Sequence, residues 1–199
     1  MTTDKVNILE RLRTETRTNH DRLEEVAASD KLANGALTAA EYIKLLEANY
    51  AAHRQLESAV LGFPRMETLL DGRQKTPLLE TDLQQAGIAP AAVWEQLKTQ
   101  LPAPQPASRY QALGMQYVME GATLGGVVIL KALQQHPQLQ QHQPFHYYGC
   151  YGGDTGRRWS SFKQLLQQEA QGPQAEAEIL EGAKEAYQLF EKAFLAVQM

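Results

Sequence analysis

Apolar residues recur every three to four positions over long windows of this chain, which is the spacing of an amphipathic α-helix. No window alternates apolar and polar residues for long enough to indicate a β-strand, and the β-branched residues are scattered. The pattern therefore predicts an all-α protein. The expected helices cover residues 6–28, 39–61, 77–86, 90–100, 108–134, 156–170 and 174–197.

Residues at the starts of these helices support the assignment. Thr38 and Glu41 form the sequence signature of a capping box, in which each side chain accepts a hydrogen bond from the other residue's free amide. Pro77 and Pro90 suit the first turns of two short helices, because proline has no amide hydrogen to lose there. A glutamine-rich, proline-punctuated segment, residues 136–144, is expected to bend.

Length, charge and cysteine content restrict the class of protein. A chain of 199 residues is of ordinary size for one domain, so residues 1–199 are expected to form a single domain. The net charge of −4 leaves no broad basic stripe, which argues against nucleic-acid binding. Cys150 is the only cysteine, so no disulfide can form within the chain. No stretch reaches the roughly 18 apolar residues of a membrane span. We therefore expect a cytoplasmic protein without a membrane partner.

Two histidines lie on the apolar faces of the first two long helices. His20 shares a face with Leu12 and Leu23, and His53 shares one with Leu45 and Leu56. A buried histidine needs a partner for each ring nitrogen, which either a metal or a neighbouring helix can supply. Periodicity predicts that both point inward and does not choose between them.

The expected helix 108–134 contains three glycines in its interior. Each of Gly121, Gly125 and Gly126 costs about 1 kcal/mol relative to alanine in a helix. One interpretation is that a flat ligand lies against bare backbone here. The other is close packing of two helices at small residues.

Three segments together resemble the haem oxygenase family, and most closely its bacterial, biliverdin-producing branch. They are LRTETRTNHDRLEE, YVMEGATLGGVVI and FHYYGCYGGDTGRRWSSFKQLL, in this order and at matching spacing. The resemblance implies a single-domain helical bundle of the haem oxygenase type. It also implies that His20 is the proximal ligand of the haem iron, and that Glu24 contacts the other nitrogen of the same ring.

In the same resemblance, the backbone at Gly121, Gly125 and Gly126 covers the opposite, distal face of the haem and takes part in catalysis by position. The chain departs from the mammalian pattern after the first of these glycines, because it has Ala122 in place of an aspartate that organises distal water. Thr123 or nearby backbone is then expected to take over that task.

Basic and aromatic residues complete the implied haem site. Lys163, Arg13 and Arg17 are the candidate partners of the haem propionates. Gln167 replaces a family arginine, for which Arg157 or Arg158 could compensate.

The aromatic residues expected to line the pocket are Tyr117, Phe162 and Trp159. As the default alternative, aromatic residues at helical spacing are ordinary core residues.

The implied activity is oxidative cleavage of haem to biliverdin, carbon monoxide and ferrous iron. Haem would be both cofactor and substrate, dioxygen the co-substrate, and a ferredoxin or flavin reductase the electron donor. The chain has no serine, cysteine or paired-acid catalytic constellation, and this reaction needs none.

Three alternatives remain open at this level. A haem or bilin carrier of the same fold would keep His20 without turnover. A thiaminase-like hydrolase would use Cys150, which has no evident activating base in the sequence. A helical scaffold would bind no small molecule at all.

Overall fold

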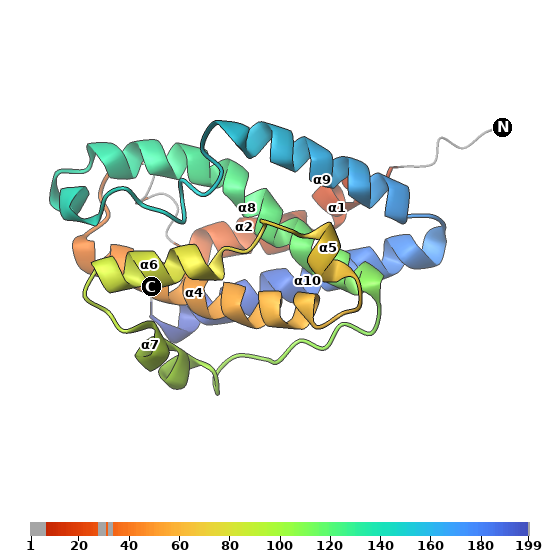
Figure 1. Cartoon of the computed structure of the whole chain (residues 1–199), viewed down its shortest axis with the longest axis horizontal. Coiled ribbons are helices and arrows are strands. Elements are labelled where there is room, and N and C mark those ends of the chain that lie inside the picture. Colours follow the sequence, from red (N-terminus) through yellow and green to blue (C-terminus); the bar gives the residue numbers. More distant parts are fainter. Residues whose placement is uncertain (1–6, 28–30, 32–33, 199) are drawn as a thin grey trace.

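The structure is a computed structural model, and it describes residues 7–27, 31 and 34–198. These residues form α-helices and short 3-10 helices, and no strand occurs among them (Figure 1). The all-α prediction is therefore confirmed. The α-helices are α1 Ile8–Glu15, α2 Arg17–Val26, α4 Ala39–Leu61, α5 Met66–Leu69, α6 Thr76–Gln85, α7 Pro90–Leu97, α8 Arg109–Gln135, α9 Thr155–Glu169 and α10 Pro173–Ala196.

The first expected helix is divided in two. Helix α1 ends at Glu15 and α2 begins at Arg17, because Thr16 leaves helical geometry at φ −109° and ψ 8°. The Thr16 hydroxyl donates to the carbonyl of Leu12 at 2.6 Å, which is a known way for threonine to bend a helix. Residues 6 and 28, the expected ends, lie outside the described residues.

The other helix boundaries agree closely with the sequence. The predicted capping box of Thr38 and Glu41 is formed at the start of α4. Pro77 and Pro90 lie in the first turns of α6 and α7, although α7 ends three residues earlier than expected. The short α5 was not predicted. The segment 136–144 forms a 3-10 helix, Pro137–His142, followed by a cis bond between Gln143 and Pro144.

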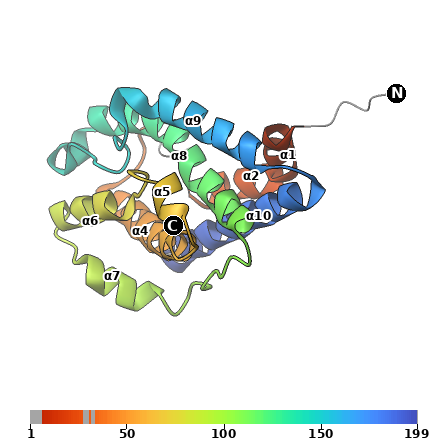
Figure 2. The same cartoon turned by 45° about the vertical axis from the view of Figure 1, so that its right-hand side comes forward.

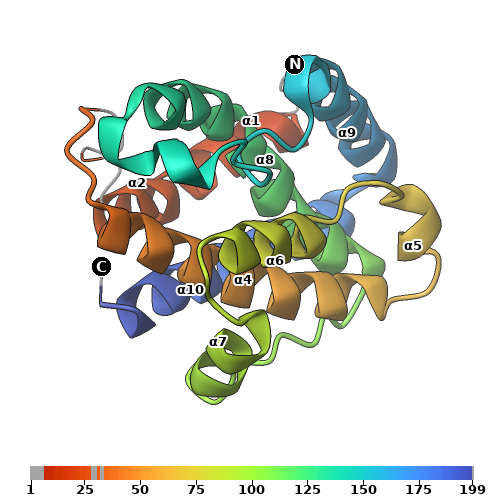
Figure 3. The same cartoon turned by 60° about the vertical axis from the view of Figure 1, so that its left-hand side comes forward.

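The core lies between α4, α8 and α10. Helix α9 lies on one side of α8, with α4 and α10 on the other, and α6 and α7 flank α4 (Figures 1, 2 and 3). The long helices bury their apolar faces against one another, and the fully buried side chains of Tyr42, Leu46 and Leu56 all come from α4.

Helices α8 and α10 approach each other at two glycines. A Cβ added to Gly114 would lie 1.9 Å from the carbonyl oxygen of Ile179, and one added to Gly182 would lie 2.0 Å from that of Gln111. Neither distance is possible between real atoms, so the crossing requires glycine on both helices. Close helix packing at small residues therefore occurs in this fold, at glycines that the sequence analysis did not single out.

Helix α8 bends near its middle (Figures 1 and 2). Gly121, Gly125 and Gly126 also lie near the middle of α8, and glycine is a recognised cause of such bends. By length and composition α8 could also cross a membrane, contrary to the sequence expectation. Half of its most apolar window is buried inside the protein, as in the core helix of a bundle.

A cluster of buried charges joins α8 to the segment before α6. The ammonium of Lys75 is fully buried and donates to one carboxylate oxygen of Glu120 at 2.6 Å and to the hydroxyl of Tyr151 at 2.7 Å. The guanidinium of Arg73 pairs with the other oxygen of Glu120. Each buried charge thus has a partner, as burial requires.

Candidate functional site

A cavity of about 470 Å³ lies between the N-terminal helices and α8. Helices α1 and α2 form one wall, and the bent part of α8 forms the facing wall. Aromatic residues of α10 and the segment 147–148 close the inner end. Such a volume is typical of small-molecule sites in proteins.

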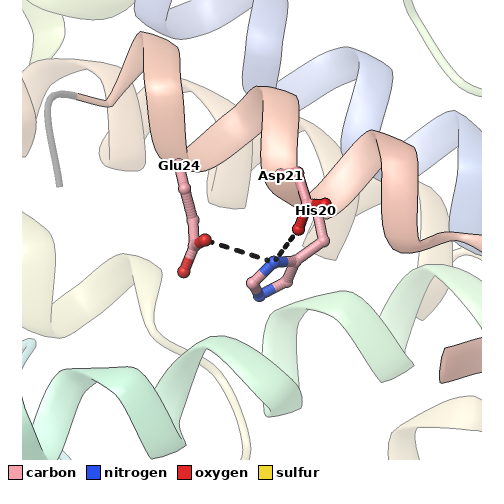
Figure 4. A group of neighbouring side chains, drawn as sticks. All are labelled: His20, Asp21 and Glu24. Atoms are coloured by element: carbon pink, nitrogen blue, oxygen red, sulfur yellow. Dashed lines mark ion pairs between the residues drawn. The ribbon is translucent and has the colours of Figure 1, made fainter.

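His20 projects from α2 at the wall of this cavity. Its side chain is 50 % exposed, so the prediction that it points into the apolar core is wrong: the ring faces the cavity instead. The Nδ1 atom lies 3.7 Å from a carboxylate oxygen of Asp21 and 3.6 Å from one of Glu24. Figure 4 shows that the other ring nitrogen points away from both carboxylates, which leaves it free to bind a ligand.

The three side chains have ligand atoms within 4.8 Å of one another. Both carboxylates lie on the Nδ1 side of the ring, which orients the imidazole with its other nitrogen turned away from them. The ring edge of Tyr187 packs against His20 with centroids 6.2 Å apart, and burial raises the pKa of Tyr187 to about 12.

His53 is a core residue in this structure. Its ring is completely buried, its Nε2 lies 3.1 Å from the hydroxyl of Tyr147, and its Nδ1 lies 3.6 Å from Glu57. It does not line the cavity. The tertiary structure therefore separates two histidines that periodicity could not distinguish.

The glycines of α8 divide into two kinds. Gly121 and Gly125 line the cavity; a Cβ at Gly121 would meet only a ring atom of Trp159 at 3.8 Å, and one at Gly125 would meet no atom within 4 Å. Close helix packing does not explain these two. Gly126 is not a lining residue: a Cβ there would lie 3.6 Å from the carbonyl oxygen of Tyr148.

Two of the three predicted basic residues line the cavity. Arg13 and Arg17 are exposed on the α1 and α2 wall, and Arg17 donates to both carboxylate oxygens of Asp21 at 2.8 and 3.0 Å. Lys163 is not a lining residue. Its ammonium lies 5.9 Å from the ring centre of Trp159, which does line the cavity.

The remaining predicted residues are placed unequally. Tyr117 and Trp159 line the cavity, whereas Phe162 is fully buried outside it and packs beside Arg73. The Thr123 hydroxyl donates to the carbonyl of Glu120 in its own helix, so it does not face the cavity.

Arg157, Arg158 and Cys150 also lie away from the cavity. Arg157 pairs with Asp154, and Arg158 donates to the carbonyl of Gly72 at 2.9 Å. Burial raises the pKa of the Cys150 thiol, which is the reverse of what a nucleophilic cysteine needs.

Several lining residues were missed by the sequence analysis. Asn49 of α4, Tyr147 and three aromatic residues of α10 form the inner end of the cavity. Asn49 shares the helical face of His53, one turn earlier, and this was the signal available in the sequence. The α10 residues have the spacing of ordinary core positions and carry no such signal. They are Tyr187, Phe190 and Phe194.

Comparisons with known proteins agree with this geometry. The family model described as heme oxygenase matches residues 6–196. A heme oxygenase of Xanthomonas campestris pv. campestris (strain 8004) is 32 % identical over 126 residues, which cover 62 % of this chain and 69 % of that protein.

Solved structures of haem oxygenases have the same fold. The NO- and CO-bound enzyme of Neisseria meningitidis matches with a TM-score of 0.69 at 20 % identity, covering 97 % of this chain and 92 % of that one. The haem complex of heme oxygenase-1 from Synechocystis sp. PCC6803 matches with a TM-score of 0.67 at 18 % identity, covering 97 % of this chain and 93 % of that one. The enzyme of Leptospira interrogans matches with a TM-score of 0.70 at 15 % identity, covering 95 % of this chain and 98 % of that one.

Proposed function

The chain belongs to the haem oxygenase family and is a haem-degrading enzyme, and from this premise we propose that His20 holds the haem iron in the cavity between α2 and α8. The observation that carries the proposal is the position of His20. It lies on one cavity wall with its Nδ1 facing two carboxylates, while bare backbone lines the wall opposite. Residues 1–199 are proposed to form one domain around this site.

The shape of the cavity suits a flat ligand. At Gly121 and Gly125 the absence of a side chain leaves cavity space that a longer side chain would fill. Tyr117 and Trp159 contribute apolar ring surface. A porphyrin ring could therefore lie between α2 and α8, with its iron toward His20.

The charges at the cavity suit a ligand that carries two carboxylates. Arg13 and Arg17 stand on the exposed part of the wall, where haem propionates would reach solvent. Lys163, beside Trp159 at the border of the cavity, is a third candidate partner. Occupation of Arg17 by a propionate would compete with its ion pair to Asp21.

Different residues of the chain are proposed to have different roles in the reaction. Bound haem supplies the iron at which dioxygen is activated with electrons from an external donor. His20 would hold the iron through Nε2, and the carboxylates of Asp21 and Glu24, 3.7 and 3.6 Å from Nδ1, would orient the ring. The backbone at Gly121 and Gly125 leaves room for a small molecule above the ring. Apolar side chains keep bulk water out.

The proposed products are biliverdin, carbon monoxide and ferrous iron. We propose a ferredoxin or a flavin reductase as the electron donor, and a cytoplasmic location. Ala122 lines the cavity where a carboxylate could have held water. Ala122, together with Gln167 in place of a family arginine, favours the second candidate function, a carrier that binds haem without opening it.

A spectroscopic titration tests the iron ligand. The His20→Ala variant is expected to lose the absorption spectrum of histidine-ligated haem, because no other imidazole lines the cavity among the described residues. His146→Ala, in the segment after the cis proline, is the matched control and should keep the wild-type spectrum. A wild-type spectrum in His20→Ala would exclude the assignment.

Turnover distinguishes the two candidate functions. Wild-type haem complex supplied with air and electrons should form bilin, followed by its visible absorption. Haem that stays intact under these conditions would favour the carrier.

A further inference from the structure

Two polar side chains that are hydrogen-bonded to each other lie at the inner end of the cavity. Asn49 and Tyr147 both line the cavity there, and they are only 7 % and 8 % exposed. The hydroxyl of Tyr147 donates to the Oδ1 atom of Asn49 at 3.0 Å. Polar side chains so deeply buried must have their hydrogen bonds arranged in advance, because water cannot reach them freely.

The donors of Asn49 are not all used. Its Nδ2 atom donates to the carbonyl of Leu45 at 2.8 Å, and its Oδ1 accepts from Tyr147. These two partners fix which end of the amide carries nitrogen. An amide has two N–H donors, so one remains without an acceptor among the described residues, on a side chain that borders the cavity.

A second layer of residues holds this arrangement. Since Tyr147 gives its proton to Asn49, its oxygen accepts one from Nε2 of His53 at 3.1 Å. Burial lowers the pKa of His53, which favours the neutral ring. Its Nδ1 has no hydrogen-bond partner and lies 3.6 Å from Glu57. Glu57 in turn accepts from the backbone amide of Lys75 at 2.5 Å.

Among the α8 residues that line the cavity, only Tyr117 has a side chain that can donate or accept a hydrogen bond. Ala122 is apolar, and the Thr123 hydroxyl is used within its own helix.

We propose that the free amide N–H of Asn49 donates a hydrogen bond, directly or through one water, to a small oxygen-containing ligand bound beside the haem. Tyr147 and His53 are the positioning residues that keep the amide turned toward the cavity. This inference rests on the proposed function, because it requires haem in the cavity. It places in α4 a polar group that Ala122 of α8 cannot provide.

Ligand probes of the haem complex test the proposal. Asn49→Leu keeps the volume but removes the amide, so fluoride affinity of the ferric complex should fall about five-fold, the effect of one lost hydrogen bond. The C–O stretching frequency of the ferrous carbon monoxide complex should rise, because a hydrogen bond to the ligand lowers it. Haem affinity should change less than about two-fold, since the iron ligand is untouched.

Tyr147→Phe tests the positioning role. Without the hydroxyl the amide is free to rotate, so both readouts should move in the same direction as in Asn49→Leu, by a smaller amount. Tyr42→Phe is the matched control: it removes a buried tyrosine hydroxyl from α4, the helix of Asn49, outside the cavity. It should leave both readouts unchanged.

The outcomes separate this inference from the proposed function. Unchanged fluoride affinity and C–O frequency in a folded Asn49→Leu haem complex would overturn the role of Asn49 while His20 remains the ligand. Loss of the histidine spectrum in the wild type would refute the proposed site itself. Asn49→Ala provides the same two readouts if the leucine variant does not fold.

Discussion

At the scale of single residues, burial decides what each histidine can do. His20 is half exposed at a cavity and keeps a nitrogen free for a ligand, whereas His53 is enclosed by Tyr147, Glu57 and Phe190. Burial disfavours the charged form of an imidazole, and it lowers the pKa of His53 more than the nearby carboxylate raises it. The same side chain therefore faces a cavity in one place and forms part of the core in the other.

The lowered pKa of His53 predicts a specific pH dependence of stability. In the unfolded chain His53 takes up a proton as the pH falls through its ordinary value of 6.5, while in the folded chain it stays neutral to lower pH. Below about pH 6.5 the unfolded state then binds more protons than the folded state. The free energy of unfolding therefore decreases as the pH is lowered, by up to about 1.4 kcal/mol per pH unit. Urea unfolding of His53→Gln at several pH values should show a smaller slope than the wild type.

A second buried histidine contributes to the same pH dependence. Burial also lowers the pKa of His142, so His142→Gln should reduce the slope separately. Parallel stability curves for the wild type and His53→Gln would mean that the pKa of His53 is the same in the folded and unfolded chain, against the effect of burial.

At the scale of elements, α8 uses glycine for two purposes that look alike in sequence. Gly114 permits contact with α10, because a Cβ there would overlap the backbone of Ile179. Gly121 and Gly125 face the cavity, where an added Cβ would meet only a ring atom of Trp159, 3.8 Å from Gly121. Only the neighbour across the helix distinguishes a packing glycine from one that leaves room for a ligand.

Substitutions at the two kinds of glycine should have opposite effects. Gly125→Leu should preserve or slightly raise stability, by up to about 1 kcal/mol of helix propensity, while lowering haem affinity at least about ten-fold as the side chain fills the cavity. Gly114→Ala should destabilise the fold by about 3 kcal/mol, because α8 and α10 must separate. Urea unfolding without haem and haem titration measure the two effects. Wild-type haem affinity in Gly125→Leu would show that the ring does not lie there.

At the scale of the whole molecule, the buried charges behind the cavity connect elements distant in sequence. Glu120 lies one residue before Gly121, and its carboxylate holds Lys75 and Arg73 of the segment before α6. Tyr151, from the segment before α9, joins the same cluster. The position of the cavity wall on α8 is thus tied to two other parts of the fold.

Neutralising the centre of this cluster should be costly. Glu120→Gln leaves two buried cations without a counter-charge, so we expect a loss of about 3 kcal/mol in the free energy of unfolding. Glu95→Gln is the matched control, because its pair with Lys98 is exposed and worth under about 1 kcal/mol. Chemical unfolding of both variants provides the comparison. Equal, small losses would show that the cluster is not a closed, buried unit.

Local interactions account for what the sequence by itself determined. Helix positions follow from the spacing of apolar residues and from caps such as Thr38 with Glu41, which act within a few residues of chain. The family followed from three segments in matching order. His20, Tyr117 and the two cavity glycines were also reached in this way, and the structure places them all at one cavity.

The tertiary structure alone decided what depends on neighbours far along the chain. It placed His20 at a cavity and His53 in the core, moved Gly126 and Phe162 out of the site, and brought Asn49 against Tyr147, 98 residues away. Periodicity reports which face of a helix is apolar, but it cannot say whether that face meets another side chain or an empty space. That difference is set by packing, and packing is a property of the assembled fold.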